Sequence, residues 1–123
     1  DPQTPAEKQA EEDMKTGPGA WFVQTGCFVC HSVAALKVRS PAQIGPDLST
    51  AVEDTQKRFA MTVDQFIKNP TGTMSVVLSR QIILTPEERE VAIQKLREAY
   101  AEYQRLVAEG KNPLAPAAGG ASK

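Results

Sequence analysis

Cys27-Phe28-Val29-Cys30-His31 is the stretch that restricts the fold and chemistry of this chain most. Two cysteines separated by two residues and followed at once by a histidine are typical of the attachment site of a c-type haem. At this spacing both sulfur atoms reach the two vinyl groups along one haem edge to form thioethers, and the next residue brings its imidazole under the iron. The motif therefore predicts Cys27 and Cys30 as attachment residues and His31 as the proximal iron ligand.

Three other interpretations of the same motif remain open. A structural zinc site needs four protein ligands, whereas the chain has two cysteines and one histidine. A redox-active dithiol of the thioredoxin kind needs a βαβ setting, and the surrounding sequence has a helical pattern. A disulfide needs only the two cysteines, but it leaves the adjoining histidine without a role. Each alternative explains less of the motif than haem attachment does.

The composition of the chain limits the second axial ligand. Because His31 is the single histidine, a haem with two histidine ligands is excluded within one chain, and methionine is the favoured sixth ligand. The candidates are Met14, Met61 and Met74. Met74 follows Pro70 and Gly72, which favour a non-helical loop able to present a thioether to the iron. Single methionines are most often core filler, and we interpret the other two in that way.

Three motifs in this order resemble the signature of a class I, mitochondrial-type monohaem cytochrome c, over about residues 17–105. They are Cys27 to His31, then Gly45-Pro46-Asp47-Leu48, then Pro70 to Met74. The resemblance implies one covalently bound haem c with His31 and Met74 as axial ligands. It also implies that the backbone carbonyl of Pro46 accepts a hydrogen bond from the free ring nitrogen of His31, which orients the imidazole and raises its basicity.

Capping boxes of the form Ser/Thr-x-x-Glu/Gln mark four predicted helix starts. They begin at Thr4, Thr50, Thr62 and Thr85. We expect helices over about 5–16, 51–59 and 63–68, a helix that carries residues 20–23 into the haem motif, and a long last helix from 86 to a stop at Gly110. No strand-like alternation competes, so the predicted class is all-α. The resemblance implies the class I cytochrome c fold, with helices wrapped around the haem, an extra N-terminal helix and an extended C-terminal helix.

Apolar residues of the last helix recur at three- and four-residue intervals and predict its buried face. They are Ala92, Leu96, Tyr100, Tyr103 and Val107. In the family fold the first and last helices of the haem domain cross, which implies that Gly19 and Phe22 meet this face near Leu96 and Tyr100. We expect both tyrosine hydroxyls to point toward water.

Other apolar side chains near the motifs have a structural and a functional interpretation. Trp21 is interpreted as a partly buried aromatic at a helix contact. Phe66, Ile67 and Val29 are candidates for the wall of a haem pocket or for the general core.

The chain of 123 residues is long enough for one domain and one core. We expect an N-terminal extension over 1–16, a haem domain over 17–109 and a flexible tail over 110–123. No apolar stretch approaches the roughly 20 residues of a membrane span. The chain does not begin with methionine and shows no signal peptide, so Asp1 is interpreted as a processed start. The resemblance then implies a periplasmic or otherwise exported protein.

Charge is distributed unevenly along the chain, with a net −4 over residues 1–14 and +3 over residues 15–80. The basic residues of the middle segment are candidates for steering an acidic redox partner. No basic stripe indicates a nucleic-acid partner.

These features predict a soluble electron carrier rather than an enzyme, with one haem iron that cycles between Fe(III) and Fe(II) and redox proteins as partners. A cytochrome c subunit of a larger oxidoreductase is the alternative, so the chain is a monomer or part of a complex. A gas-binding or peroxidase-like haem protein is the third interpretation, and it requires Met74 to be absent from the iron or easily displaced.

Overall fold

The computed structural model of the chain describes residues 2–115. Its elements, in order, are α1 (Pro5–Thr16), α2 (Ala20–Thr25), η1 (Cys27–Val29), η2 (Ala34–Leu36), η3 (Leu48–Thr50), α3 (Ala51–Phe59), α4 (Val63–Lys68), α5 (Thr73–Val76), η4 (Val77–Gln81) and α6 (Pro86–Ala108). The described residues contain no strand, and one isolated bridge pairs Val33 with Val38. The predicted all-α class is confirmed for this part of the chain.

Three of the four predicted capping boxes are present. The side chains of Thr4, Thr62 and Thr85 each accept a hydrogen bond from the backbone three residues on, and the Glu or Gln at that position reciprocates. These boxes satisfy backbone donors that the first helical turn leaves open. Helix α1 therefore starts at Pro5, as predicted, and α6 starts at Pro86.

The fourth predicted box, at Thr50 and Glu53, is wrong. The chain enters α3 through the 3-10 turn η3, in which the side chain of Asp47 accepts from Ser49 N at 2.8 Å. Thr50 makes no side-chain cap, and its hydroxyl donates to Asp54 at 3.1 Å. Glu53 is unavailable for capping because it accepts the hydroxyl proton of Tyr100 at 2.6 Å. A tertiary contact has replaced the local one.

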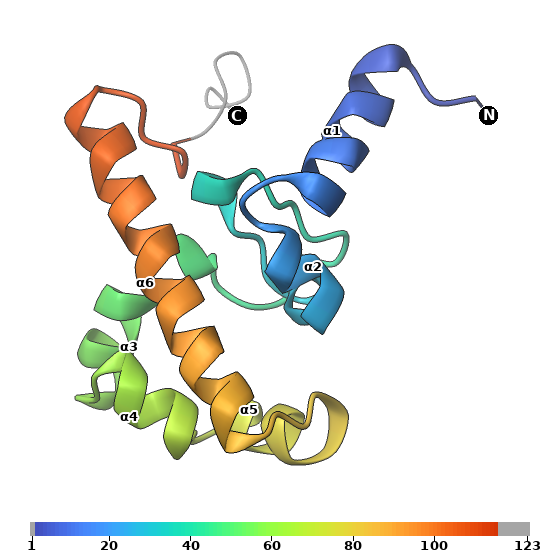
Figure 1. The fold of residues 1–123 in the computed structure, drawn as a ribbon. Helices are drawn as coiled ribbons and strands as arrows, with labels where there is room; N and C mark the ends of the chain where they lie inside the picture. Colours follow the sequence, from blue (N-terminus) through green and yellow to red (C-terminus); the bar gives the residue numbers. More distant parts are fainter. Residues whose placement is uncertain (1, 116–123) are drawn as a thin grey trace.

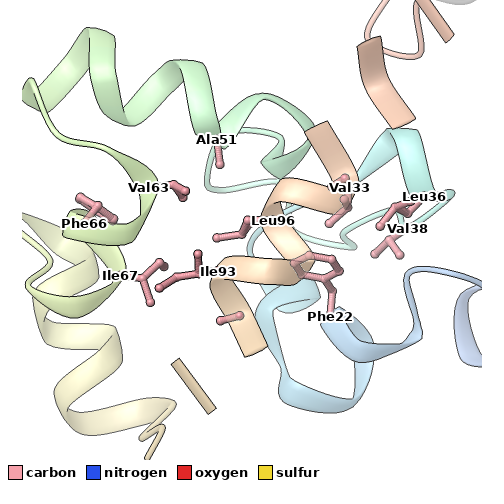
Figure 2. Close-up of a cluster of buried hydrophobic side chains, with 12 residues drawn as sticks. Phe22, Val33, Leu36, Val38, Ala51, Val63, Phe66, Ile67, Ile93 and Leu96 are labelled. Carbon is pink, nitrogen blue, oxygen red and sulfur yellow. The ribbon is translucent and has the colours of Figure 1, made fainter. Parts of the chain in front are cut away.

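Helix α6 organises the core. It packs against η2, η3, α3 and α4, and Figure 1 shows it running beside the latter two while α1 leads away from the rest. Ile93 and Leu96 of α6 lie between Phe66 and Ile67 of α4 on one side and Phe22 on the other (Figure 2). Helix α4 on one side of α6 and helix α2 on the other thus contribute to one hydrophobic core.

The buried face of α6 differs in part from the predicted one. Ala92 and Leu96 are buried as predicted, and Ala99 is fully buried. Tyr100 and Tyr103 are half-buried, while Val107 is 42% exposed. The end of α6 that carries Val107 extends beyond α3 and α4 (Figure 1). The predicted periodicity continues there without a partner element to cover it.

The hydroxyl of Tyr100 was expected to point toward water, and it donates to the partly exposed carboxylate of Glu53 of α3. The predicted contact of Gly19 is wrong. A Cβ atom on Gly19 would lie 2.3 Å from Val38 Cγ2 and 3.0 Å from the Leu36 carbonyl. Gly19 therefore allows close approach of the segment after η2, and α2 packs mainly against α1 and η1.

The two ends of the described chain differ in how they are held. Helix α1 is exposed over residues 5–12, and only its last turn brings the half-buried Met14 against the core. At the other end, Gly110 has a φ of +76°. Its amide donates to Val107 O at 2.9 Å, and the Lys111 amide donates to Leu106 O at 2.8 Å. These bonds form a Schellman motif, which confirms the predicted stop at Gly110.

We predicted a flexible tail over residues 110–123. Its last eight residues, 116–123, lie outside the described part of the chain. Before that point Leu114 N donates to the side chain of Asn112 at 2.9 Å, which forms a local turn. Within residues 2–115, no helix combines the length and the apolar character that crossing a membrane requires.

Candidate functional site

The cysteine motif forms a compact turn directly after α2. Gly26 ends α2 with a φ of +99°, a conformation that glycine adopts without steric cost. The carbonyl of Cys27 then accepts from the amides of both Cys30, at 3.3 Å, and His31, at 3.1 Å. Both sulfur-bearing residues and the histidine are therefore carried by one turn of backbone.

Both cysteines are free thiols and partly buried. Burial raises the pKa of the Cys27 thiol to about 11, so this thiol stays protonated at neutral pH. A redox-active dithiol needs the opposite shift, because the thiolate is the form that attacks a disulfide. The environment of Cys27 thus disfavours the dithiol interpretation.

His31 is held in one orientation. Its side chain is buried, with 9% exposed, and its Nδ1 lies 2.7 Å from the backbone carbonyl of Pro46. A carbonyl only accepts, so Nδ1 carries the proton in this contact, and in the neutral imidazole Nε2 keeps its lone pair. This arrangement fixes the tautomer that a metal-ligating histidine needs. The contact that the resemblance implied between His31 and Pro46 is present, while Pro46 itself is exposed.

Gly45 lies against the face of the imidazole. A Cβ atom at this position would lie 2.2 Å from Cε1, 2.6 Å from Nδ1 and 2.8 Å from Nε2 of His31. Any side chain at residue 45 would therefore displace the ring or the loop. The sequence analysis gave Gly45 only as the first residue of the second motif, and its role as a spacer for His31 was missed. The only available signal was a glycine directly before Pro46.

A series of hydrogen bonds joins the segment after Ile44 to the segment after Cys30. Gly45 N donates to Cys30 O at 2.7 Å, and Leu48 N donates to Ser32 O at 2.9 Å. Further along, the Asp47 carboxylate accepts from Ala34 N at 3.2 Å and the Ser49 hydroxyl accepts from Ala35 N at 2.9 Å. The carbonyl of Pro46 is thereby fixed relative to His31 from both sides.

Ser40 is a second residue that sequence reasoning missed. It is fully buried, and its hydroxyl donates to Val29 O at 2.8 Å, inside the cysteine motif. The same oxygen accepts from Gln43 N at 3.0 Å. Ser40 therefore ties the cysteine turn to the loop that leads to Gly45. No pattern around this serine indicates such a role, because both partners depend on the fold.

Met74 belongs to a different segment. It was expected in a non-helical loop, but it is the second residue of the short helix α5, which begins after Gly72 with a φ of +65°. Met74 is half-buried and packs against the core, as Met14 and Met61 also do. The chain after α5 returns to the motif, since a Cβ on Gly26 would lie 3.7 Å from Ile82 Cδ1. The described contacts join Cys27, Cys30, His31 and Pro46, and they include none between Met74 and His31.

The remaining candidates for a pocket wall differ in their burial. Phe66 and Ile67 are buried in the core, whereas Val29 is 50% exposed and does not line the interior. Trp21 is partly buried, as predicted, with its ring edge-to-face against Phe22 at 5.2 Å between centroids. Two open hollows of about 560 and 480 Å³ lie along α6 and beside Met61, and neither is lined by a residue of the cysteine motif.

The donor set of the motif fits a haem better than an ion held by the protein alone. Within residues 2–115, no group of three or more His, Cys, Asp or Glu side chains is placed to hold a metal ion. A structural zinc site needs four such ligands. A haem iron needs one protein ligand on its proximal side, and His31, with Nδ1 engaged by Pro46, leaves Nε2 as the ring nitrogen available to a metal, on the same turn as two thiols. Comparison of the chain with protein-family models, curated proteins and solved structures found no match.

Proposed function

We propose that this chain is an electron-transfer protein of the class I cytochrome c type, with one haem c attached through Cys27 and Cys30. The observation that carries the proposal is the fixed imidazole of His31, whose Nδ1 is engaged by Pro46 and which lies on the same turn as two free thiols. When bound, the haem supplies a metal that gains and loses one electron. The protein binds, orients and tunes this group and makes no bonds in a substrate, so no enzyme activity is proposed.

The chain's own residues have distinct tasks in this proposal. Cys27 and Cys30 hold one haem edge, and His31 is the proximal ligand. Pro46 keeps a proton on Nδ1 and makes Nε2 a stronger donor. Met74 is the proposed distal ligand, and its thioether raises the reduction potential and keeps small molecules from the iron.

The surface near the motif suggests where a redox partner docks. Val29 is 50% exposed, Ile44 is 76% exposed and Ile83 is 73% exposed. Val29 precedes Cys30, Ile44 precedes Gly45, which is bonded to Cys30, and Ile83 follows Ile82, which contacts Gly26. Exposed apolar side chains mark an interaction surface where they form one patch, and the proposal is that these three do. The proposed partners are other redox proteins, and the proposed location is the periplasm or another exported compartment.

One observation favours the alternative that the chain is a subunit of a larger oxidoreductase. Helix α1 has no buried residue, and an isolated helix of this length is marginally stable in water. A partner subunit that covers α1 would supply the missing contacts. Size analysis of the native protein under mild conditions separates a monomeric carrier from a subunit.

Acid-acetone extraction tests the central proposal. We expect the denatured protein to keep its colour and its intact mass to exceed the chain mass by one haem. Colour that passes completely into the organic phase would contradict covalent attachment. Carbon monoxide addition to the reduced protein tests the third interpretation, because stable binding would indicate a gas-binding or peroxidase-like site in which Met74 does not hold the iron.

A further inference from the structure

Arg89, in the first turn of α6, contacts two backbone carbonyls that lie on either side of Met74 in the sequence. Its Nη1 donates to the carbonyl of Ile67, and its Nη2 lies 3.5 Å from the carbonyl of Leu78. Ile67 is in the last turn of α4, and Leu78 is in η4. One guanidinium therefore bridges the two ends of the segment that carries Met74.

Local structure leaves at least one of these carbonyls in need of a donor. Helix α4 ends at Lys68, and the last carbonyls of a helix have no intrahelical partner. Pro70 stops the ladder, so the amide of Thr71 does not continue it to the carbonyl of Ile67. A cation at a helix C-terminus is also favourable because it opposes the partial negative charge there. Arg89 meets both needs with charge-assisted hydrogen bonds, which are stronger than neutral ones.

Between its two ends, the contacts of the Met74 segment are the packing of Met74 against the core and bonds within the segment. Gly72 has a φ of +65°, and no atom outside its immediate neighbours lies within 4 Å of a Cβ built on it. The internal bonds of the segment are local, such as Ser75 N to Gly72 O at 3.0 Å. The position of Met74 therefore depends on its packing against the core and on where the ends of the segment are fixed.

Other polar contacts between α4 and α6 do not reach beyond Met74. Arg97 pairs with Asp64 at the start of α4, and Lys68 pairs with Glu90 at 3.0 Å. Both pairs involve exposed side chains, and such pairs add little to stability. Neither of them touches η4. Arg97 is thus a matched control for Arg89, since it lies on the same helix, carries the same charge and also contacts α4.

We propose that Arg89 is a positioning residue that holds the Met74 segment in place and so sets how readily an external ligand displaces Met74 from the iron. This inference rests on the proposed haem site with Met74 as distal ligand. An external ligand binds only the fraction of molecules in which Met74 is detached, and its apparent affinity rises with that fraction. Loosening one end of the segment increases the detached fraction.

Imidazole titration of the oxidised haem protein tests this role, with the absorption spectrum as readout. We expect Arg89→Met to bind imidazole about tenfold more tightly than the wild type, the loss expected for a hydrogen bond to a charged group. The reduction potential should fall in the same variant. Arg97→Met should keep the wild-type affinity, and Met74→Ala should bind most tightly of all. If Arg89→Met does not fold, Arg89→Gln decides, with a smaller shift in the same direction because its amide reaches one carbonyl.

Three results would overturn the inference, and they are distinguishable. Wild-type affinity in the Arg89 variants together with tighter binding in Met74→Ala would remove the role of Arg89 and leave the proposed haem site intact. Wild-type affinity in Met74→Ala would show that Met74 is not the distal ligand, and the inference would fall with that part of the proposed function. Equal tightening in Arg97→Met and Arg89→Met would indicate general destabilisation and would also overturn it.

Discussion

Substitution of Gly45 by alanine should displace His31. The added Cβ would lie 2.2 Å from Cε1 of the imidazole, whereas ordinary contact begins at 3.4 Å, so the two must separate by at least about 1.2 Å. The Gly45 amide is bonded to Cys30 O at 2.7 Å, and His31 to Pro46 O at 2.7 Å. A shift of that size cannot keep both bonds at their lengths.

The magnitude follows from these contacts. Overpacking of a close-packed site costs about 1–3 kcal/mol, and the loss of one hydrogen bond adds about 1 kcal/mol. We expect the free energy of unfolding of Gly45→Ala to fall by about 2–4 kcal/mol, measured by chemical denaturation. In the haem-loaded protein the reduction potential should also move, because the hydrogen bond that His31 donates to Pro46 O no longer tunes the imidazole.

Gly110→Ala is the control for this experiment. Gly110 has a φ of +76° and open space around it, so alanine there strains the backbone by about 1–2 kcal/mol without a clash. This variant should lose stability but keep the wild-type spectrum and potential. A Gly45→Ala protein with wild-type stability and potential would refute the argument that Gly45 makes room for the imidazole.

Three further variants or conditions test the rest of the site. Met74→Ala should erase the weak far-red sulfur-to-iron charge-transfer band of the oxidised protein, lower the potential and open the reduced iron to carbon monoxide, whereas Met61→Leu should do none of these. Burial raises the pKa of Cys27 from 9.0 to about 11. The contribution of this thiol to the free energy of unfolding of the haem-free protein should therefore be full below pH 9 and decline as pH rises toward 11. The haem-loaded protein should lack this decline, because a thioether does not titrate. Deletion of residues 1–14 should lower stability only slightly, because α1 buries little, and unchanged stability, spectrum and partner kinetics would make the segment a passive extension.

Local patterns predicted the helices because the signals that start and stop them lie within a few residues. The boxes at Thr4, Thr62 and Thr85 pair residues three positions apart, and no distant group competes for them. The box at Thr50 failed because Glu53 is used by Tyr100, which lies 47 residues away in the sequence. A capping signal is thus reliable only while its side chains are free of tertiary contacts.

The candidate site shows the same division between local and distant information. The cysteine turn is local, and the contact between His31 and Pro46 was expected only through an ordered set of motifs. Gly45 and Ser40 were missed because their partners, the ring of His31 and the carbonyl of Val29, come close only after the loop folds back. The helical position of Met74 was missed because Gly72 starts α5 instead of extending the loop.

The two sides of the proposed site are held in different ways, and this difference has a chemical consequence. Backbone bonds from Gly45 and Leu48, together with the buried Ser40, fix the segment around His31 at several points. The Met74 segment is fixed mainly at its ends, where Arg89 contacts Ile67 and Leu78. A ligand that competes for the iron should therefore replace Met74 and leave His31 bound, because detaching the methionine disturbs fewer contacts. Imidazole adducts should then keep the proximal histidine, and a spectrum that shows loss of His31 before Met74 would contradict this order.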